Sequence, residues 1–332
     1  MPDAGGAAQN PAPGADSPGT APPPGMSVVL LVNPEAGMRP AGVGALEALL
    51  RARGARVETV VTERRGDGTT IARQAAAAGA DVLLACGGDG TLNEAVNGLA
   101  GTETALATFP AGTINVWARE VGIPTDAARA AALLWDGERR WIDLGRAGER
   151  YFLLMAGVGF DADVAAQVTR PEKRRWGPLA YIGRGVVTAI RWPRQRMWLN
   201  LDGRPLRRRL LFVVVGNTRL YGGVVNITDR AVADDGLLDV CLFGGQGIAE
   251  KLFHALRVAT RRHTRHPTVE YYRVRRLTLV TRPRVAVQVD GDTIGQTPMT
   301  FQAVERALKV VVPRASLVPR GGDGLFLTPP ER

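Results

Sequence analysis

The chain has 332 residues, 45% of them apolar, and its 42 Lys and Arg exceed its 32 Asp and Glu to give a net charge of +10. This length fits two domains of ordinary size, and the charge indicates an anionic partner such as nucleic acid, lipid headgroups or a phosphorylated substrate. Two cysteines within apolar runs do not form a disulfide framework, and no apolar stretch is long enough to predict a membrane-spanning helix or a signal peptide.

The first part of the chain predicts an α/β domain over residues 26–142, preceded by an Ala-, Gly- and Pro-rich tail over 1–25 that we expect to be disordered. Short apolar runs predict strands at 28–32, 57–61, 82–86 and 105–109. Helical periodicity falls between and after them at 43–53, 69–78, 92–99, 115–120 and 126–135. Such alternation, with glycine-rich turns after the strands, is typical of a doubly wound parallel sheet.

The second part, residues 143–315, predicts a mostly antiparallel, β-sandwich-like domain. Strand patterns occur at 141–144, 151–156, 197–201, 208–215, 238–243, 276–280, 284–289 and 308–312, and helical patterns at 161–169, 177–191 and 247–262. Residues 316–332 are again rich in Pro and Gly and predict a loose tail, although Leu325-Phe326-Leu327 could dock on the protein.

One loop stands out for its chemistry. Gly87-Gly88-Asp89-Gly90-Thr91 follows a buried strand and opens a helix. Glycines let a backbone approach an anion closely, and the N–H groups at a helix start point towards it. No Gly-Lys-Ser/Thr follows, so this is not a Walker loop. Taken alone, the pattern also fits a plain tight turn between strand and helix.

Further loops repeat the theme in a fixed order. They are Asn33-Pro34-x-x-Gly37, Pro110-x-Gly112-Thr113-x-Asn115 and Gly157-x-Gly159-Phe160-Asp161, followed by Gly222-Gly223, Asp234-Asp235-Gly236-Leu237-Leu238-Asp239 and Val289-Asp290-Gly291. The ordered set resembles the diacylglycerol-kinase catalytic family, including sphingosine and ceramide kinases and bacterial lipid kinases, over residues 26–313. The resemblance implies an N-terminal fold like that of NAD kinases and phosphofructokinases, and an ATP-dependent lipid kinase.

The resemblance also implies roles for particular residues. It places ATP against Asn33, Thr62, Gly87, Gly88, Asp89, Gly90, Thr91, Asn93, Thr113 and Asn115, with Mg²⁺ near Asp89. It makes Asp290 and Asp89 the catalytic residues, with Asp290 as the general base. It also implies a structural Mg²⁺ held by the Asp235 side chain and the carbonyls of Val232 and Leu237. Where the family usually has Glu two residues after the base, this chain has Asp292.

Independently of the resemblance, Asp290 follows an alternating strand and precedes a glycine, so it lies at a strand end where a carboxylate can face a cleft. Phosphoryl transfer needs such a group to take the hydroxyl proton, together with charge neutralisation on the phosphate. An ordinary Asp-Gly hairpin turn is the alternative interpretation.

Residues 170–198 indicate where the acceptor is found. This segment holds eight basic residues, one acid, three Trp and one Tyr, a combination that suits an anionic membrane surface. We therefore predict a cytoplasmic protein that associates peripherally with membranes, although the same side chains could instead pack on the second domain. The sequence does not exclude a homodimer.

Three other functions are weighed against the lipid kinase. A kinase of a soluble acceptor, like NAD kinase, would share the nucleotide loops but not need the basic aromatic segment. A non-catalytic lipid-binding module would need neither Asp89 nor Asp290. Nucleic-acid binding is not expected, because aromatic residues are sparse outside 170–198 and no nucleic-acid motif is present.

Overall fold

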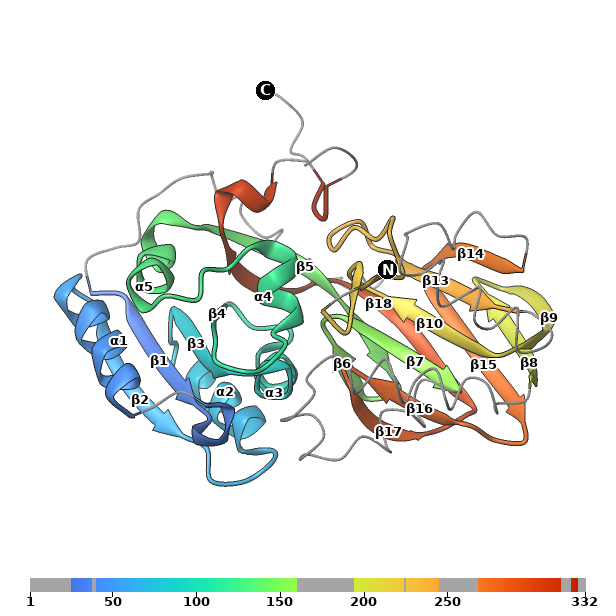
Figure 1. Cartoon of the computed structure of the whole chain (residues 1–332), viewed down its shortest axis with the longest axis horizontal. Helices are drawn as coiled ribbons and strands as arrows, with labels where there is room; N and C mark the ends of the chain where they lie inside the picture. The colour runs from blue at the N-terminus through green and yellow to red at the C-terminus, as the bar shows by residue number, and fades with distance from the viewer. Residues whose placement is uncertain are drawn as a thin grey trace, which may run out of the picture.

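The computed structural model describes residues 25–37, 40–159, 194–223, 225–244, 268–317 and 324–327. Figure 1 shows two lobes side by side, one of mixed helices and strands and one of strands. The predicted N-terminal tail and the predicted helices at 161–169, 177–191 and 247–262 lie outside the described residues.

The N-terminal lobe is built on a parallel sheet with the strand order β2-β1-β3-β4. Its strands are β1 (Ser27–Val32), β2 (Arg56–Val61), β3 (Val82–Gly87) and β4 (Ala105–Pro110). Its helices are α1 (Pro40–Ala52), α2 (Asp67–Ala77), α3 (Asp89–Leu99), α4 (Val116–Val121) and α5 (Ala127–Asp136), with a short 3-10 turn η1 (Pro34–Ala36) after β1. Helix α1 packs beside α5 and α2 beside α3, so helices cover the sheet as a doubly wound fold requires.

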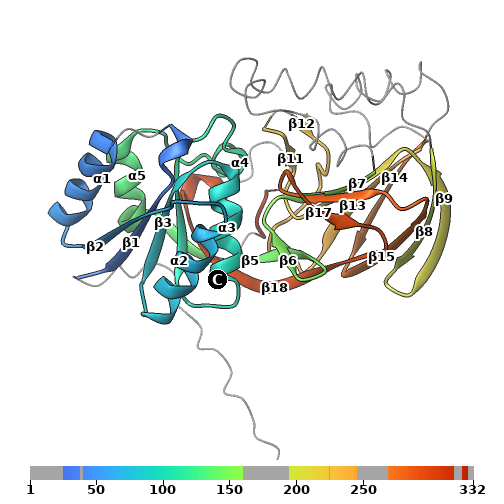
Figure 2. The same ribbon diagram turned by 90° about the horizontal axis from the view of Figure 1, so that it is seen from below.

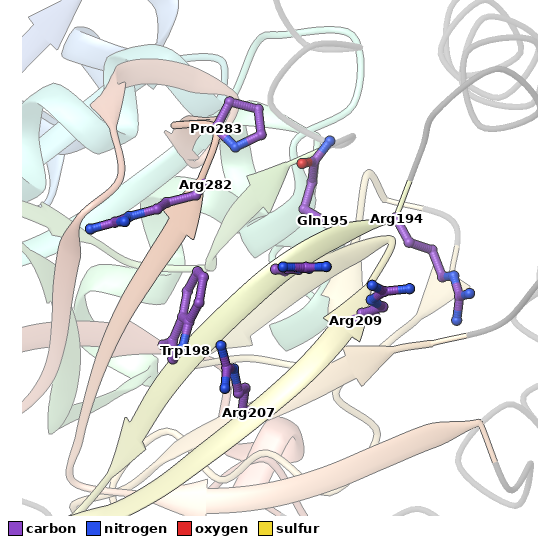
Figure 3. Close-up of a pocket in the computed structure, with 8 residues that line it drawn as sticks. Arg194, Gln195, Trp198, Arg207, Arg209, Arg282 and Pro283 are labelled. Atoms are coloured by element: carbon purple, nitrogen blue, oxygen red, sulfur yellow. The ribbon is translucent and has the colours of Figure 1, made fainter.

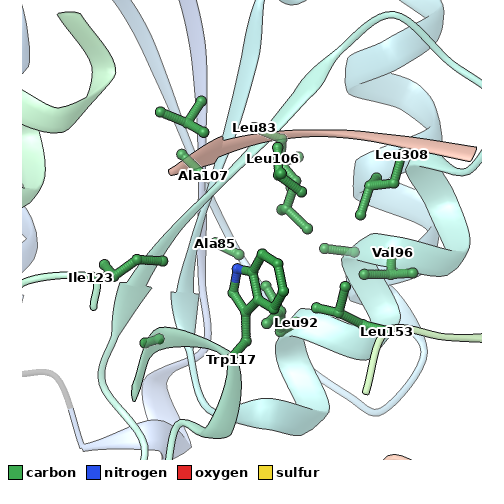
Figure 4. Packing of buried hydrophobic residues seen from close by; sticks show 14 of the residues in the cluster. Leu83, Ala85, Leu92, Val96, Leu106, Ala107, Trp117, Ile123, Leu153 and Leu308 are labelled. Carbon is green, nitrogen blue, oxygen red and sulfur yellow. The ribbon is translucent and has the colours of Figure 1, made fainter. Parts of the chain in front are cut away.

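Every residue of β3 and β4 is buried, which explains why these strands appear in the sequence as continuous apolar runs rather than as alternating patterns. The core of this lobe lies between the sheet and the helices on its two faces. Trp117 is its largest side chain and is 1% exposed. It lies against Ala85 and Leu92 in Figure 4, where Leu308 from the far end of the chain joins the same cluster.

The C-terminal lobe is a sandwich of two largely antiparallel sheets, as predicted. One is a six-stranded sheet with the order β14-β13-β10-β7-β16-β17, and the other contains β5, β6, β8, β9, β15 and β18. The strands are β5 (Glu138–Ala147), β6 (Arg150–Phe152), β7 (Met155–Gly159), β8 (Gln195–Leu201), β9 (Arg204–Leu210), β10 (Phe212–Gly216), β13 (Leu238–Phe243), β14 (Val269–Val274), β15 (Arg276–Arg282), β16 (Ala286–Val289), β17 (Asp292–Gln296) and β18 (Met299–Val312). A two-stranded ribbon, β11 (Leu220–Tyr221) with β12 (Val225–Asn226), and a 3-10 turn η3 (Arg314–Leu317) complete the described elements.

Two long strands join the lobes. β5 and β18 pair antiparallel from Ala147–Phe301 at one end to Glu138–Val312 at the other, and β18 also pairs with β4. The register of β18 shifts between Val304 and Leu308. The N-terminal parallel sheet therefore continues into one layer of the sandwich, and the predicted domain boundary at residues 142–143 falls inside β5.

Two features differ from the sequence pattern for clear physical reasons. The predicted strand over 151–156 is divided into β6 and β7, because the N–H groups of Leu153, Leu154 and Met155 donate to a side chain instead of a neighbouring strand. In the tail predicted to be loose, the segment that the sequence left open as a docking segment is docked: Leu325 and Phe326 are buried, and the Leu325 carbonyl accepts a hydrogen bond from the N–H of Ala233.

Candidate active site

The glycine loops after β3 and β4 lie in direct contact. A Cβ atom added to Gly112 would lie 2.5 Å from the Cα atom of Gly88, and one added to Gly87 would lie 2.4 Å from the hydroxyl of Thr91. Real Cβ atoms do not approach other atoms so closely, so only glycine fits at these two positions without movement of the loops. Gly88 immediately precedes α3, whose first N–H groups are therefore free to bind an anion.

The loop after β1 is fixed to this centre. The Asn33 side chain donates to the Thr91 hydroxyl at 2.9 Å and accepts from the N–H of Glu35 at 3.0 Å, which caps the η1 turn. Thr62 directly follows β2, and its N–H donates to the carbonyl of Val32. Because β1 to β4 are parallel, these residues all lie at the carboxyl edge of the sheet, where doubly wound folds bind ligands.

Asn115 holds the loop after β4 in place. It has a left-handed backbone with φ of 53°, and its side chain both accepts from the N–H of Gly112 at 3.0 Å and donates to the Gly112 carbonyl at 2.6 Å. The next N–H, that of Val116, donates to the Asp89 carboxylate at 2.7 Å. Burial raises the pKa of Asp89 to about 6, an effect that the Val116 hydrogen bond partly offsets.

Asp290 enters from the other lobe, at the turn between β16 and β17, with φ of 47°. Its carboxylate accepts four hydrogen bonds: from the N–H groups of Leu153, Leu154 and Met155 at 2.8 to 3.0 Å, and from the Asn93 amide at 2.8 Å. Burial raises the pKa of Asp290, and the hydrogen bonds act in the opposite direction. The residue thus links helix α3 of one lobe to the β6–β7 segment of the other.

A chain of charged groups continues from Asn93. Arg150 donates to the Asn93 side-chain oxygen at 2.5 Å and lies 4.0 Å from the Asp292 carboxylate. Asp292 also pairs with Arg65 of the N-terminal lobe at 2.9 Å. Asp292 is therefore held between two arginines. Arg150 also fixes the orientation of the Asn93 amide, which contacts Asp290.

One cavity of about 300 Å³ lies between the lobes. From the N-terminal lobe it is lined by Asp89, Gly90, Thr113, Ile114 and Val116, and from the C-terminal lobe by Leu154, Met155, Leu220, Tyr221, Gly222, Gln288, Asp290, Gly291 and Asp292. The cavity therefore brings the two predicted catalytic carboxylates, Asp89 and Asp290, into one space, with apolar side chains beside them.

A buried contact holds the far wall of this cavity. The Glu120 carboxylate on α4 accepts from the N–H groups of Arg219 at 2.7 Å and Leu220 at 3.2 Å, and burial raises its pKa. Strand β11, formed by Leu220 and Tyr221, is thereby attached to the N-terminal lobe.

The residues proposed to hold a structural Mg²⁺ make other contacts. One oxygen of Asp235 accepts from the N–H of Leu237 at 3.0 Å, and the other pairs with the guanidinium of Arg273. Each oxygen of the Asp235 carboxylate thus has one protein donor, and the Mg²⁺ site implied at Asp235, Val232 and Leu237 stays a prediction. Across the described residues, no three His, Cys, Asp or Glu side chains gather in a way that could hold a metal ion.

Several residues of the site carry no signal in the sequence. Arg150, Leu154, Met155 and Glu120 act through backbone or side-chain contacts between distant segments, and no local motif marks them. Of the basic aromatic segment 170–198, only residues 194–198 are described, and they begin β8. Within the described part of the chain, no helix is long and apolar enough to cross a membrane.

Comparison with known proteins agrees with this arrangement. Residues 27–147 match the family described as "Diacylglycerol kinase catalytic domain", and residues 155–312 match "YegS C-terminal NAD kinase beta sandwich-like domain". A protein named diacylglycerol kinase from Staphylococcus aureus strain bovine RF122 / ET3-1 is 30% identical over 289 residues, covering 86% of this chain and 91% of that protein. The protein of the same name from strain JH9 is 31% identical over 272 residues, covering 80% and 86%.

Solved structures show the same fold. A crystal structure described as a diacylglycerol kinase from Bacillus anthracis strain Sterne has a TM-score of 0.73 and 24% identity, covering 87% of this chain and 98% of that one. The two family matches together span both lobes, and the staphylococcal relatives are matched over most of their length. This chain belongs to the diacylglycerol kinase family of lipid kinases.

Proposed function

We propose that this protein transfers the γ-phosphoryl group of ATP to a hydroxyl of diacylglycerol or a related lipid. The observation that carries the proposal is the interlobe cavity, which joins the nucleotide loops at Asp89 and Thr113 to Asp290 and to the apolar side chains of Leu154 and Leu220. Membership of a kinase family supports ATP as the donor, and the names of the relatives support diacylglycerol as the acceptor.

ATP would bind at the carboxyl edge of the parallel sheet. Gly88 leads directly into α3 and supplies no side-chain cap, and the first N–H groups of the helix favour negative charge. Asn33, Thr62, Thr91 and Asn115 would support the nucleotide, with Thr113 in the cavity itself. Positioning and charge stabilisation of this kind make up most of the catalysis of phosphoryl transfer.

Mg²⁺ would accompany the nucleotide at Asp89. The residue fits a cation because it is a buried carboxylate that lines the cavity, where a positive charge would offset the cost of its desolvation. When bound, the ion would neutralise charge on the phosphates. Asp89 would also keep its hydrogen bond to Val116 and so hold the loop of Thr113 in register with the helix start.

Asp290 would accept the proton of the lipid hydroxyl. All four of its hydrogen bonds come from protein groups, so the hydroxyl must displace one of them. Asn93 is the donor that can leave, because its amide also donates to the carbonyl of Tyr151 at 3.2 Å, whereas the other three donors are backbone N–H groups. Asp290 would then stand within reach of the acceptor oxygen while the backbone keeps its orientation.

The direct test is a kinase assay with radiolabelled ATP against a total lipid extract, followed by identification of the labelled lipid. Labelled phosphatidic acid is the expected product. Label in a different phospholipid or in ceramide phosphate would show that the acceptor is another lipid and not diacylglycerol. Absence of any labelled lipid would contradict the proposal.

Two alternatives have distinct outcomes in the same assay. A kinase of a soluble acceptor would transfer label to a water-soluble product and ignore vesicles. A non-catalytic lipid-binding module would consume no ATP, and Asp290→Asn would then change neither turnover nor lipid binding.

The proposed acceptor requires contact with a membrane. We therefore propose a cytoplasmic enzyme that associates peripherally with the membrane, with segment 170–198 among the contacting residues. We also propose that the protein can form a homodimer. Sedimentation equilibrium, which measures the mass of the species in solution, tests this.

A further inference from the structure

Three strands at one edge of the sandwich carry an unusual concentration of positive charge. β15, β8 and β9 are neighbours in the sheet, and together they hold seven arginines and no Asp or Glu. Their inward residues, such as Met197, Leu199 and Leu279, are buried in the sandwich core. Their outward residues border a hollow of about 770 Å³ that lies away from the interlobe cavity (Figure 3).

The register places three arginines in one row across the outward face. Arg209 of β9 lies opposite Arg196 of β8, and Arg196 lies opposite Arg282 of β15. All three side chains are exposed. We call Arg196, Arg209 and Arg282 the arginine row.

Such a row costs stability in the isolated protein. Side chains directly opposite each other in an antiparallel pair are close neighbours, and like charges there repel. Within the described residues, no carboxylate forms an ion pair with any member of the row. Arg208, which points to the other side of β9, differs: it is paired with Glu270 at 2.6 Å. A row that repels itself and has no counter-ion among the described residues points to an anionic partner.

A second row beside the first is amphipathic. Arg207 of β9 lies opposite Trp198 of β8, and Trp198 lies opposite Val280 of β15. The Arg207 guanidinium lies 5.1 Å from the centre of the Trp198 ring, and Val280 is one of the few large apolar side chains with an exposed surface, at 36%. Arginine beside a partly exposed Trp and an exposed aliphatic side chain is typical of proteins that lie at a membrane interface.

The layout favours an extended anionic surface over a small ligand. In Figure 3 the arginine side chains spread along the strands, and Arg282 and Arg194 point away from each other instead of towards a common centre. A discrete phosphate site needs donors that converge on one position. Charges spread over an open sheet face, with apolar groups between them, match the headgroup layer of a bilayer.

We propose that the outward face of β9, β8 and β15, defined by the arginine row with Arg207, Trp198 and Val280, docks this protein on anionic phospholipid bilayers. The proposal rests on the proposed function in so far as that function needs a lipid acceptor. It assigns membrane contact to a rigid sheet face that includes only the last residues of segment 170–198.

The test uses the full chain and a triple variant, Arg196→Gln, Arg209→Gln and Arg282→Gln. Binding is measured by co-sedimentation with vesicles of phosphatidylcholine and phosphatidylglycerol in equal parts, and with vesicles of phosphatidylcholine alone. Each basic residue near an anionic surface strengthens binding about 5-fold, so the triple variant is expected to bind the mixed vesicles about 100-fold more weakly. Its midpoint of thermal unfolding should rise rather than fall, because repulsion within the row is removed.

A control variant removes the same charge elsewhere. Arg56→Gln, Arg73→Gln and Arg129→Gln change three exposed arginines of the N-terminal lobe and are expected to leave vesicle binding nearly unchanged. Equal loss in both variants would show that net charge alone drives binding and would overturn the proposal. Unchanged vesicle binding by the row variant would also overturn the proposal. The same holds if wild type binds a short DNA duplex more tightly than it binds vesicles and the row variant loses that DNA binding.

A second measurement separates this proposal from the catalytic one. Turnover on a short-chain diacylglycerol that dissolves as monomers needs no membrane, so the row variant should match wild type there and fall behind only on vesicles. A wild-type protein with no turnover on the dissolved acceptor would contradict the proposed function while leaving the vesicle-binding result to decide the docking face. Reduced turnover of the row variant on the dissolved acceptor would place the row in the active site and overturn its docking role.

Discussion

The interlobe cavity and the outward face of β9, β8 and β15 are two concentrations of charge that are built in opposite ways. In the cavity, Asp290 has four protein donors, Asp292 lies between two arginines, and Asp89 accepts from Val116. On the sheet face, the arginine row has no carboxylate partner within the described residues.

The difference follows from solvent. A charge taken out of water is costly unless hydrogen bonds or an opposite charge compensate it, so the protein itself must supply partners in the cavity. Exposed arginines remain hydrated, so they do not need a partner within the protein and can bind an external anion. Charge in the cavity should therefore govern catalysis and folding together, whereas charge on the sheet face should govern attachment alone.

The largest effect is expected from Asp290→Asn. An amide cannot take the proton of the acceptor hydroxyl. Its NH₂ group must also face two of the four donors, because each carboxylate oxygen of Asp290 accepts two hydrogen bonds. We expect kcat to fall about 1000-fold, within the range typical for loss of a general base. The measurement is turnover of labelled ATP with dispersed diacylglycerol, with thermal unfolding recorded in parallel.

Measuring Asp290→Asn and the arginine-row variant in both assays separates catalysis from membrane binding. Asp290→Asn should leave vesicle binding intact, and the row variant should leave turnover on the dissolved acceptor intact. If Asp290→Asn retained wild-type turnover, Asp290 would be a structural link between the lobes, and Asp89 would become the candidate base.

The next effect concerns the pH dependence of stability. Burial raises the pKa of Asp89 to about 6 in the folded protein, above its ordinary value of 3.8, so the ionised form is disfavoured by folding. Wild type should therefore lose stability relative to Asp89→Asn as the pH rises from about 4 through about 6. The shift corresponds to about 3 kcal/mol at neutral pH.

Urea unfolding of both proteins at several pH values gives this difference. Since the Asn oxygen can still accept from the N–H of Val116, the variant keeps the hydrogen bond of the loop. A difference in unfolding free energy that does not change with pH would mean that Asp89 is not desolvated as described, and the contrast between cavity and sheet face would weaken.

A smaller effect is expected from Gly112→Ala. The added methyl group would lie 2.5 Å from Gly88 Cα and 2.8 Å from the Asn115 side-chain oxygen, so the two glycine loops must separate. We expect a loss of about 1 to 3 kcal/mol in unfolding free energy. Gly90→Ala is the matched control, because a Cβ there meets no atom within 4 Å, and its stability should equal or exceed that of wild type. Equal stability of both variants would exclude a tight contact between the loops.

The fold could be predicted from the sequence where burial imposes a periodic pattern. β1, β3 and β4 are almost entirely apolar because both faces of the parallel sheet are covered, and helices between them show the period of an α-helix. The full length of β18 could not be predicted. Its register shift is held by the Asp143 carboxylate, which accepts from the N–H groups of Arg306 and Gly236, and this contact between distant segments leaves no local pattern.

The candidate site divides in the same way. Gly88, Gly112 and Asn115 stand in motifs because a close backbone contact or a left-handed residue restricts which side chains fit. The partners of Asp290 are mostly backbone N–H groups, which any residue supplies, so Leu153 to Met155 look like an ordinary strand. Arg150 lies in a hairpin far from Asn93 in the sequence, and only the folded structure shows that the two meet.

The smallest effect is expected at Arg150, which tests whether contacts that the sequence does not reveal matter for catalysis. Its guanidinium holds the Asn93 oxygen at 2.5 Å, so that the Asn93 nitrogen faces Asp290. Without it the amide can rotate and present its oxygen to the carboxylate. Arg150→Gln should therefore lower kcat about 10-fold, because the Asn93 oxygen would repel the Asp290 carboxylate and displace it before the acceptor hydroxyl replaces the amide. Thermal unfolding should change little, since Arg150 is partly exposed.

Two further variants test whether Arg150 acts through Asn93 or only through its charge or packing. Arg150→Lys keeps a donor near Asn93 and should recover part of kcat, which a role in packing alone would not produce. Arg65→Gln removes the other cation beside Asp292 but does not touch Asn93, and because the Arg65 side chain is 74% exposed, its ion pair should contribute little. Equal losses of kcat in Arg65→Gln and Arg150→Gln would assign the effect to the charge of Asp292. A loss confined to Arg150→Gln, without a change in the KM for ATP, would show that Arg150 acts through Asn93 on Asp290.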